Sequence, residues 1–219
     1  MAGMSGFEHT CDTGKVNISQ FKRTIHCSGL NFDEVSIIWD FYVAHSFASA
    51  CGQAITLEEY GWANTVSKVN GLPKLEEELM SSSGVEKLCC IRSTSIKDTL
   101  SACDLSGTVI CVEHPRIVLQ QLYELNYNEN EEIHVSSKES RIIALFRHIR
   151  NALAHGNTYF FENGMVLLED KESSKITAKI LIKKQTLLDW IYIIDKNERF
   201  YRRPTSEEVV GSEMEENAN

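Results

Sequence analysis

The chain of 219 residues lacks several patterns that define common protein classes. Its seven Cys are odd in number and form no Cys-x-x-Cys pair, which disfavours a disulfide framework and a zinc knuckle. The N-terminal segment has no apolar core typical of a signal peptide. The longest uncharged run, Phe41–Leu57, includes His45 and Gln53, so it predicts a buried helix rather than a membrane span. These features together favour a reduced, cytoplasmic protein that is not bound to a membrane.

Positive charge is also scarce. The formal net charge is −9, with 22 Lys and Arg against 31 Asp and Glu. This balance disfavours a protein that coats nucleic acid non-specifically, because such binding depends on the neutralisation of many phosphates. Any contact with RNA or DNA must therefore be local. Residues 204–219 include five Glu and no Lys or Arg, and we expect them to form an acidic, disordered tail.

One stretch reverses the local charge, because no Asp or Glu occurs between Glu139 and Glu162. Apolar residues recur there at spacings of one, three and four, which is typical of an amphipathic helix. Ser136 with Glu139 fits a capping box and Gly156 fits a left-handed stop, so the sequence predicts a helix over 136–155. The predicted buried stripe consists of Ile142, Leu145, Phe146, Ile149 and Leu153.

The rest of the chain predicts one domain over 31–197, preceded by an irregular N-terminal arm (1–30). The expected fold is mainly α, with a small β-hairpin or sheet after the motif helix. Capping signatures and helical periodicity predict helices over 31–51, 56–69, 85–90, 96–105, 115–125 and 187–194. Gly71-Leu-Pro73 predicts the start of a further short, Glu-rich helix. This helix is expected to end before a loop at 81–84. An Asn-Gly turn and alternating residues predict a β-hairpin over 158–169, a strand over 176–182, and a strand or loop over 108–112.

The basic end of the 136–155 helix contains Arg150-Asn-Ala-Leu-Ala-His155, an Arg and a His separated by four residues. The chain has seven His, and Arg141 with His148 forms a second pair at a comparable spacing. Spacing alone therefore does not select a site. The position at a helix end, the following Gly156 and the surroundings without acidic residues favour the first pair.

With these residues the sequence resembles the HEPN domain family, whose ribonuclease members carry Arg-x4–6-His, often with a polar residue after the Arg. Asn151 matches that polar residue. The stretch 137–161, with Gly156 and Asn157 after His155 and a hairpin after that, most resembles the HEPN group found on plasmids and in bacterial defence or toxin loci. The resemblance extends over roughly residues 110–195. It implies a HEPN-like helical bundle that needs no metal or other cofactor. It also implies a homodimer that joins two motifs across a two-fold interface, with RNA as substrate and an antitoxin or regulatory protein as partner, in a toxin–antitoxin or antiviral defence system.

The implied activity is an endoribonuclease that acts by 2′-OH transesterification. The RNA 2′-hydroxyl attacks the adjacent phosphodiester when a base takes its proton and cations hold the non-bridging oxygens. His155 suits the acid or base role, because histidine exchanges protons near neutrality. Arg150 suits the phosphate-stabilising role, since a guanidinium stays cationic and presents two parallel donors. Asn151 would support this pair, and Arg147 is a further candidate for binding the substrate.

The same residues also have structural interpretations. Arg150 could bridge to a carboxylate, and His155 could stabilise the helix end, where the helix dipole favours a cation. Arg147 could be a solvated surface charge, and Asn151 could orient Arg150 or His155 or cap a turn. At the level of function, one alternative is a non-catalytic HEPN module that binds a nucleotide, a nucleic acid or a protein. Another is a helical subunit whose acidic tail docks a basic partner.

Overall fold

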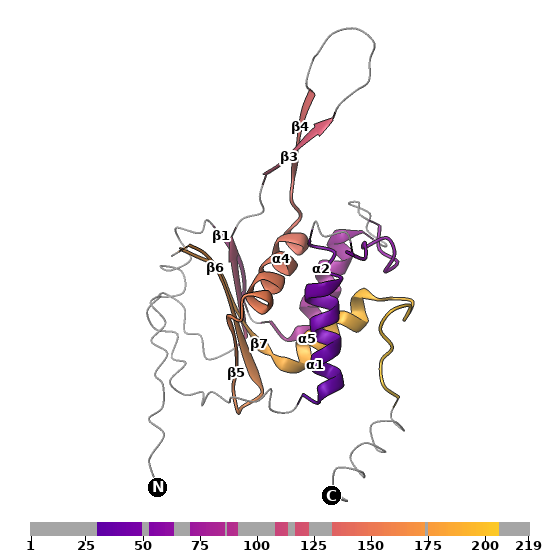
Figure 1. Ribbon diagram of the computed structural model, residues 1–219, viewed down its shortest axis with the longest axis vertical. Coiled ribbons are helices and arrows are strands. Elements are labelled where there is room, and N and C mark those ends of the chain that lie inside the picture. Colours follow the sequence, from indigo (N-terminus) through magenta and orange to yellow (C-terminus); the bar gives the residue numbers. More distant parts are fainter. Residues whose placement is uncertain are drawn as a thin grey trace, which may run out of the picture.

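The computed structural model describes residues 30–49, 53–63, 71–85, 87–91, 108–113, 117–122, 133–173 and 175–205. These residues form a five-stranded sheet with helices on one face and a separate two-stranded hairpin (Figure 1). In chain order the elements are α1 (Phe32–Trp39), the π-helix η2 (Asp40–Ala44), α2 (Leu72–Ser83), β1 (Lys87–Ile91), β2 (Val109–Glu113), β3 (Ile117–Leu122), β4 (Ile133–Lys138), α4 (Arg141–Ala154), β5 (Thr158–Phe160), β6 (Met165–Glu172), β7 (Lys175–Lys183) and α5 (Lys184–Ile194).

The described part of the chain is mixed α/β, so the expectation of a mainly α bundle is wrong. The sequence predicts helices over 85–90 and 115–125, but strand β1 begins in the first range and strand β3 lies within the second. Their apolar runs are short, and periodicity alone does not separate a short buried strand from a helical turn. Residues 57–61 form turns rather than the start of a helix. The expected helix at 96–105, the arm before residue 30 and the tail after residue 205 lie outside the described residues.

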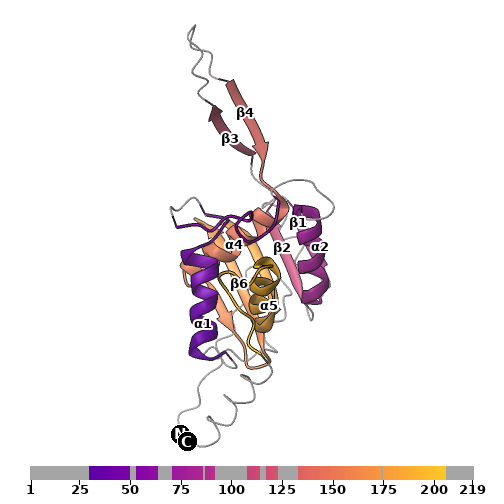
Figure 2. The same cartoon turned by 90° about the vertical axis from the view of Figure 1, so that its right-hand side faces the viewer.

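The five strands of the main sheet lie in the order β1-β2-β7-β6-β5. β1 and β2 are parallel, whereas the other neighbouring strands are antiparallel. The predicted hairpin is confirmed as β5 and β6, and the predicted strand at 176–182 is confirmed as β7. Residues 108–112, for which the sequence left a strand and a loop open, include most of strand β2. At the hairpin turn Gly164 has a φ of 80°, a left-handed conformation that glycine adopts without steric cost. Among the strands that the structure describes, β3 pairs only with β4, and both views show this pair extending away from the body (Figure 2).

Helix α1 begins at the predicted capping box. The Asn31 side chain accepts from the Glu34 N–H at 2.8 Å, and the Glu34 carboxylate accepts from the Asn31 N–H at 2.8 Å. The regular helix is shorter than expected and changes to the π-helix η2 after Trp39. His45 N–H donates to the Asp40 carbonyl at 2.9 Å, which is the wider hydrogen bond of a π-turn.

Helix α4, which carries the motif, begins four to five residues later than the sequence predicts. Ser136 lies in β4, where it pairs with Leu119, because the extended ladder satisfies its backbone. Ser140 is the actual N-cap, and its hydroxyl accepts from the Ile143 N–H at 3.1 Å. The predicted stop is confirmed, since Gly156 follows the helix with a φ of 69°.

The predicted apolar stripe fixes α4 between the sheet and η2. Ile142, Leu145, Phe146 and Ile149 are buried, and Leu153 is partly buried against the same core. The helix contacts β2, β6 and β7 on one side and η2 on the other.

An aromatic cluster around Phe146 sets the position of α4. The Phe146 ring stacks on Tyr42 with centroids 5.6 Å apart and contacts Phe47 at 4.8 Å and Trp190 at 5.8 Å. The buried Tyr42 hydroxyl is satisfied, because it donates to the Leu187 carbonyl at 2.9 Å. Such rings bury large apolar areas and add geometric preference to the packing. The cluster joins η2, α4 and α5 into one layer.

Helix α2 packs beside α5. It begins after Gly71, with Pro73 in its first turn, as the sequence predicts. It continues to Ser83, so the loop expected at 81–84 is wrong except for Gly84, which ends the helix with a φ of 59°. The Trp190 indole N–H donates to the Leu79 carbonyl at 3.0 Å and connects the two helices. Within the ranges that the structure describes, none of the helices has the length and hydropathy needed to cross a membrane.

Candidate functional site

The residues that the sequence selects lie between the middle of α4 and its C-cap. Arg147, Arg150 and Asn151 are partly buried, and His155 is exposed at the end of the helix. Of the three partly buried side chains, Asn151 contacts the sheet through Asp170 of β6. The geometry around each of them decides what the site can do.

A buried pair lies beneath the motif. His148 Nδ1 lies 2.7 Å from Asp170 Oδ2, and the two residues are 0% and 5% exposed. A carboxylate only accepts hydrogen bonds, so Nδ1 of His148 carries the proton between them. Arg141, seven residues before His148, is exposed and pairs instead with Glu76 at 3.2 Å. The second Arg–His pair of the sequence is therefore split between the surface and the core.

Asn151 connects this pair to the motif arginine. Its Nδ2 donates to Asp170 Oδ2 at 3.1 Å, and its Oδ1 accepts from Arg150 Nη1 at 3.3 Å. The contact with Arg150 is one of the three roles considered for Asn151. His148, Asp170, Asn151 and Arg150 thus form one hydrogen-bonded chain from the core to the helix surface. We call these four residues the α4–β6 network.

Asp170 is charged within this network. Burial acts to raise the pKa of its carboxyl group, but the hydrogen bonds from His148 and Asn151, the electrostatic attraction of His148 and a smaller contribution from the Thr177 hydroxyl together outweigh burial. The pKa of Asp170 therefore lies below its ordinary value, and the residue is ionised at neutral pH. An ionised acceptor forms stronger hydrogen bonds than a neutral one.

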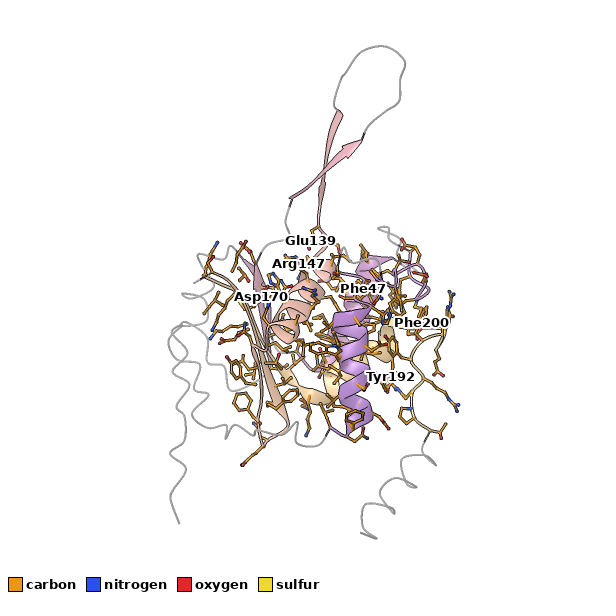
Figure 3. All side chains as sticks on the ribbon, in the orientation of Figure 1. Phe47, Glu139, Arg147, Asp170, Tyr192 and Phe200 are labelled. Carbon is orange, nitrogen blue, oxygen red and sulfur yellow. The ribbon has the colours of Figure 1, made fainter. Side chains whose placement is uncertain are left out.

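Arg147 is held by a carboxylate and is not a solvated surface charge. Its Nε and Nη2 donate to the two oxygens of Glu139 at 2.9 and 3.0 Å, and the side chains are 14% and 7% exposed. Figure 3 shows the two side chains beside each other near the start of α4, with Asp170 on the sheet side of the helix. Glu139, expected to cap the helix with Ser136, binds this arginine instead. The substrate-binding role of Arg147 stays a prediction, and the ion pair favours a structural one.

His155 lies at the C-cap of α4. Its backbone N–H donates to the Asn151 carbonyl at 3.0 Å, so it continues the helical path up to Gly156. The helical period therefore directs Arg150 and His155 about 140° apart around the axis. In the part of the chain that the structure describes, no side chain forms a hydrogen bond or ion pair with the His155 imidazole. The structure brings Arg150 and Asn151 together and leaves His155 apart from them within one chain.

Asp170 is the site residue that the sequence analysis missed. The signal was present in strand β6, where alternate residues Val166, Leu168 and Asp170 point to the same face. Two of these are apolar and buried, so a carboxylate at the third position requires a polar partner from the helix above it. The register of β6 and β7 also shifts directly after Asp170, and such bulges often reorient a side chain near a functional site.

Comparison with protein families places the chain in the HEPN class. The matching family is described as HEPN pEK499 p136, and the match covers residues 76–199. This range is more than half of the chain, so the protein belongs to this plasmid-associated HEPN family, as its sequence resemblance predicts. The range includes α4 and every residue of the α4–β6 network. No curated protein and no solved structure matches the chain.

Membership in a HEPN family is consistent with a nuclease or a nucleotide-binding module. The geometry adds a fixed cation, Arg150, and an exposed imidazole, His155, near the end of one helix. A cation of this kind can hold a phosphate, and an imidazole can exchange a proton with a hydroxyl. Across the residues that the structure describes, no group of three or more His, Cys, Asp and Glu is arranged to hold a metal ion.

Proposed function

We propose that this protein is a metal-independent endoribonuclease that cleaves RNA by 2′-OH transesterification. In this proposal His155 moves the proton, Arg150 stabilises the charge that develops on the phosphate, and Asn151 holds Arg150. The carrying observation is that Arg150 donates to Asn151, which is itself bound to Asp170, while His155 stays exposed at the same helix end. A preoriented cation lowers the barrier more than a mobile one, because it need not reorganise as charge develops.

The proposed site is composite and forms from two chains. The divergence of Arg150 and His155 around α4 supports this arrangement, since a single chain directs the two side chains to different sides. A two-fold contact at the end of α4 would bring the His155 of each chain towards the Arg150 of the other. The proposal therefore includes a homodimer, which light scattering of the purified chain would detect. In a toxin or defence system, an antitoxin or regulatory protein would control this activity.

The test is RNA cleavage by purified full-length variants. We expect His155→Ala to lower kcat by a factor of about 10² to 10⁴, because it removes general acid–base catalysis. His45→Ala is the matched control, since His45 lies on another element and pairs with Asp40 at 3.0 Å. The wild-type products should carry a 2′,3′-cyclic phosphate, and an RNA with a 2′-deoxy sugar at the cleavage position should stay intact. Equal cleavage by wild type and His155→Ala would refute the proposal.

The alternative is a non-catalytic HEPN module that binds a nucleotide, a nucleic acid or a protein. The observation that favours it is again the divergence of Arg150 and His155, because a lone chain holds a cation without an adjacent proton-transfer group. This alternative predicts that the wild type binds RNA or nucleotide without cleaving it. It also predicts that Arg150→Ala weakens binding while His155→Ala has little effect.

A further inference from the structure

The α4–β6 network has only one arrangement of donors and acceptors. An arginine guanidinium only donates hydrogen bonds, and an ionised carboxylate only accepts them. Asn151 lies between Arg150 and Asp170 and must therefore donate to one and accept from the other. The Nδ2–Oδ2 distance of 3.1 Å and the Nη1–Oδ1 distance of 3.3 Å have this polarity. By accepting from the NH₂ group of Asn151, Asp170 leaves the amide oxygen to accept from Arg150.

Asp170 is itself held from two sides. His148, which is 0% exposed, binds the same carboxylate oxygen as Asn151, at 2.7 Å. The sheet register shifts between Asp170 and Lys171, so the carboxylate stands at the end of the regular ladder. Because the strand and the buried imidazole both restrain it, the Asp170 carboxylate has a fixed position beneath the partly buried side chain of Asn151.

The orientation of the Arg150 guanidinium depends on the position of the Asp170 carboxylate. Asn151 Oδ1 is the hydrogen-bond partner of its Nη1, and its buried Nε has no partner among the described residues. Without Asp170 the Asn151 amide would lose one of the two hydrogen bonds that orient it, and its Oδ1 would no longer be held in place for Arg150. The orientation of Arg150 would no longer be set by the sheet.

We propose that Asp170, held by His148, is a positioning residue that fixes the amide of Asn151 and through it the guanidinium of Arg150. This inference rests on the proposed function for its catalytic consequence, whereas the positioning itself can be measured without activity. Asp170 does not touch the substrate, because it is buried. It acts as the link between the sheet and the candidate site.

The test uses the ¹⁵N-labelled full-length protein and the guanidinium N–H signal of Arg150, assigned by its absence in Arg150→Lys. Asp170→Ala should shift this signal towards that of a freely rotating arginine. Asp170→Asn should keep the wild-type signal, because both hydrogen bonds converge on one oxygen and an amide oxygen can replace it. Val166→Ala is the control for a general loss of packing, since Val166 is buried on the same face of β6. It should leave the signal unchanged.

RNA cleavage provides the second measurement. We expect kcat/KM to fall about 10-fold or more in Asp170→Ala and to recover to within about 3-fold of wild type in Asp170→Asn, because misplacement of a catalytic group is costly. If Asp170→Ala does not fold, Asp170→Leu, which fills the space without an acceptor, replaces it. An unchanged Arg150 signal in the folded variant would overturn the inference. A wild type that cleaves no RNA would instead refute the proposed function, and the signal would still decide the positioning role.

Discussion

The clearest energetic consequence of the α4–β6 network is the cost of its removal. Asp170→Ala takes away the acceptor of two donors, His148 Nδ1 and Asn151 Nδ2. His148 is 0% exposed, so water does not replace its lost partner. Asn151 is partly buried, so water can reach its amide more easily. The two donors should therefore contribute unequally to the loss of stability.

The magnitude follows from these two environments. An unsatisfied buried donor costs about 1–3 kcal/mol, and hydrogen bonds to charged groups lie at the upper end of this range. We assign about 2 kcal/mol to the fully buried His148 donor and about 1 kcal/mol to the partly buried Asn151 donor. Asp170→Ala should thus lower the free energy of unfolding by about 3 kcal/mol. Asp170→Asn, which keeps an oxygen at this position, should lose about 1 kcal/mol.

Urea unfolding of the full chain at pH 7 measures these values, read as a lower midpoint at an unchanged slope. Glu162→Ala is the matched control, because it removes an exposed carboxylate from the turn before β6 and should change stability by less than about 0.5 kcal/mol. Equal stability of wild type and Asp170→Ala would show that the buried hydrogen bonds contribute nothing net. That result would refute the account of the network.

The direction of the pKa shift of Asp170 predicts how the stability of the protein changes with pH. The pKa of Asp170 is lowered in the folded protein, so the folded state holds this proton less tightly than the unfolded chain. The stability that the carboxylate contributes is therefore present above its unfolded pKa of about 3.9 and lost as the pH falls through the lower folded pKa. The difference in stability between wild type and Asp170→Asn should stay constant near neutrality and shrink below about pH 4. A difference that grows as the pH falls would contradict this argument.

Three further predictions concern the packing of α4 and the ends of helices α4 and α1. Phe146→Ala should lower the free energy of unfolding by about 3–5 kcal/mol, since the ring is 1% exposed at the centre of the aromatic cluster; calorimetry would measure it, and a loss below about 1 kcal/mol would contradict the packing. Gly156→Ala should cost about 1 kcal/mol in urea unfolding because of its φ of 69°, although a Cβ there meets no atom within 4 Å; an unchanged midpoint would mean that the helix end relaxes. Asn31→Ala should cost about 1 kcal/mol through loss of the capping box, whereas Asn31→Asp should retain most of it; equal losses in both variants would exclude the capping contribution.

Local patterns predicted several elements correctly because local forces decide them. The capping box at Asn31, the left-handed stop at Gly156 and the Asn163-Gly164 hairpin depend on backbone preferences within a few residues. The buried stripe of α4 follows from helical periodicity. The family resemblance was likewise recognisable in a short stretch. These features needed no knowledge of distant partners.

The predictions from sequence are wrong where partners distant in the sequence determine the local structure. Residues 117–122 form a strand because they pair with residues 133–138, and the same pairing takes Ser136 away from the helix. Glu139 binds Arg147 at eight positions' distance rather than capping the helix start. A short apolar run carries no sign of which neighbour will satisfy its backbone.

The sequence by itself determined the motif helix, its stop and the candidate pair Arg150 and His155. Only the tertiary structure decided that Arg150 is tied to the sheet and that His155 is not. The tie runs through a contact between Asn151 and Asp170, which are 19 residues apart on a helix and a strand. That contact exists because β6 presents alternate residues to α4, so a carboxylate among buried apolar neighbours meets the amide and the imidazole that it needs.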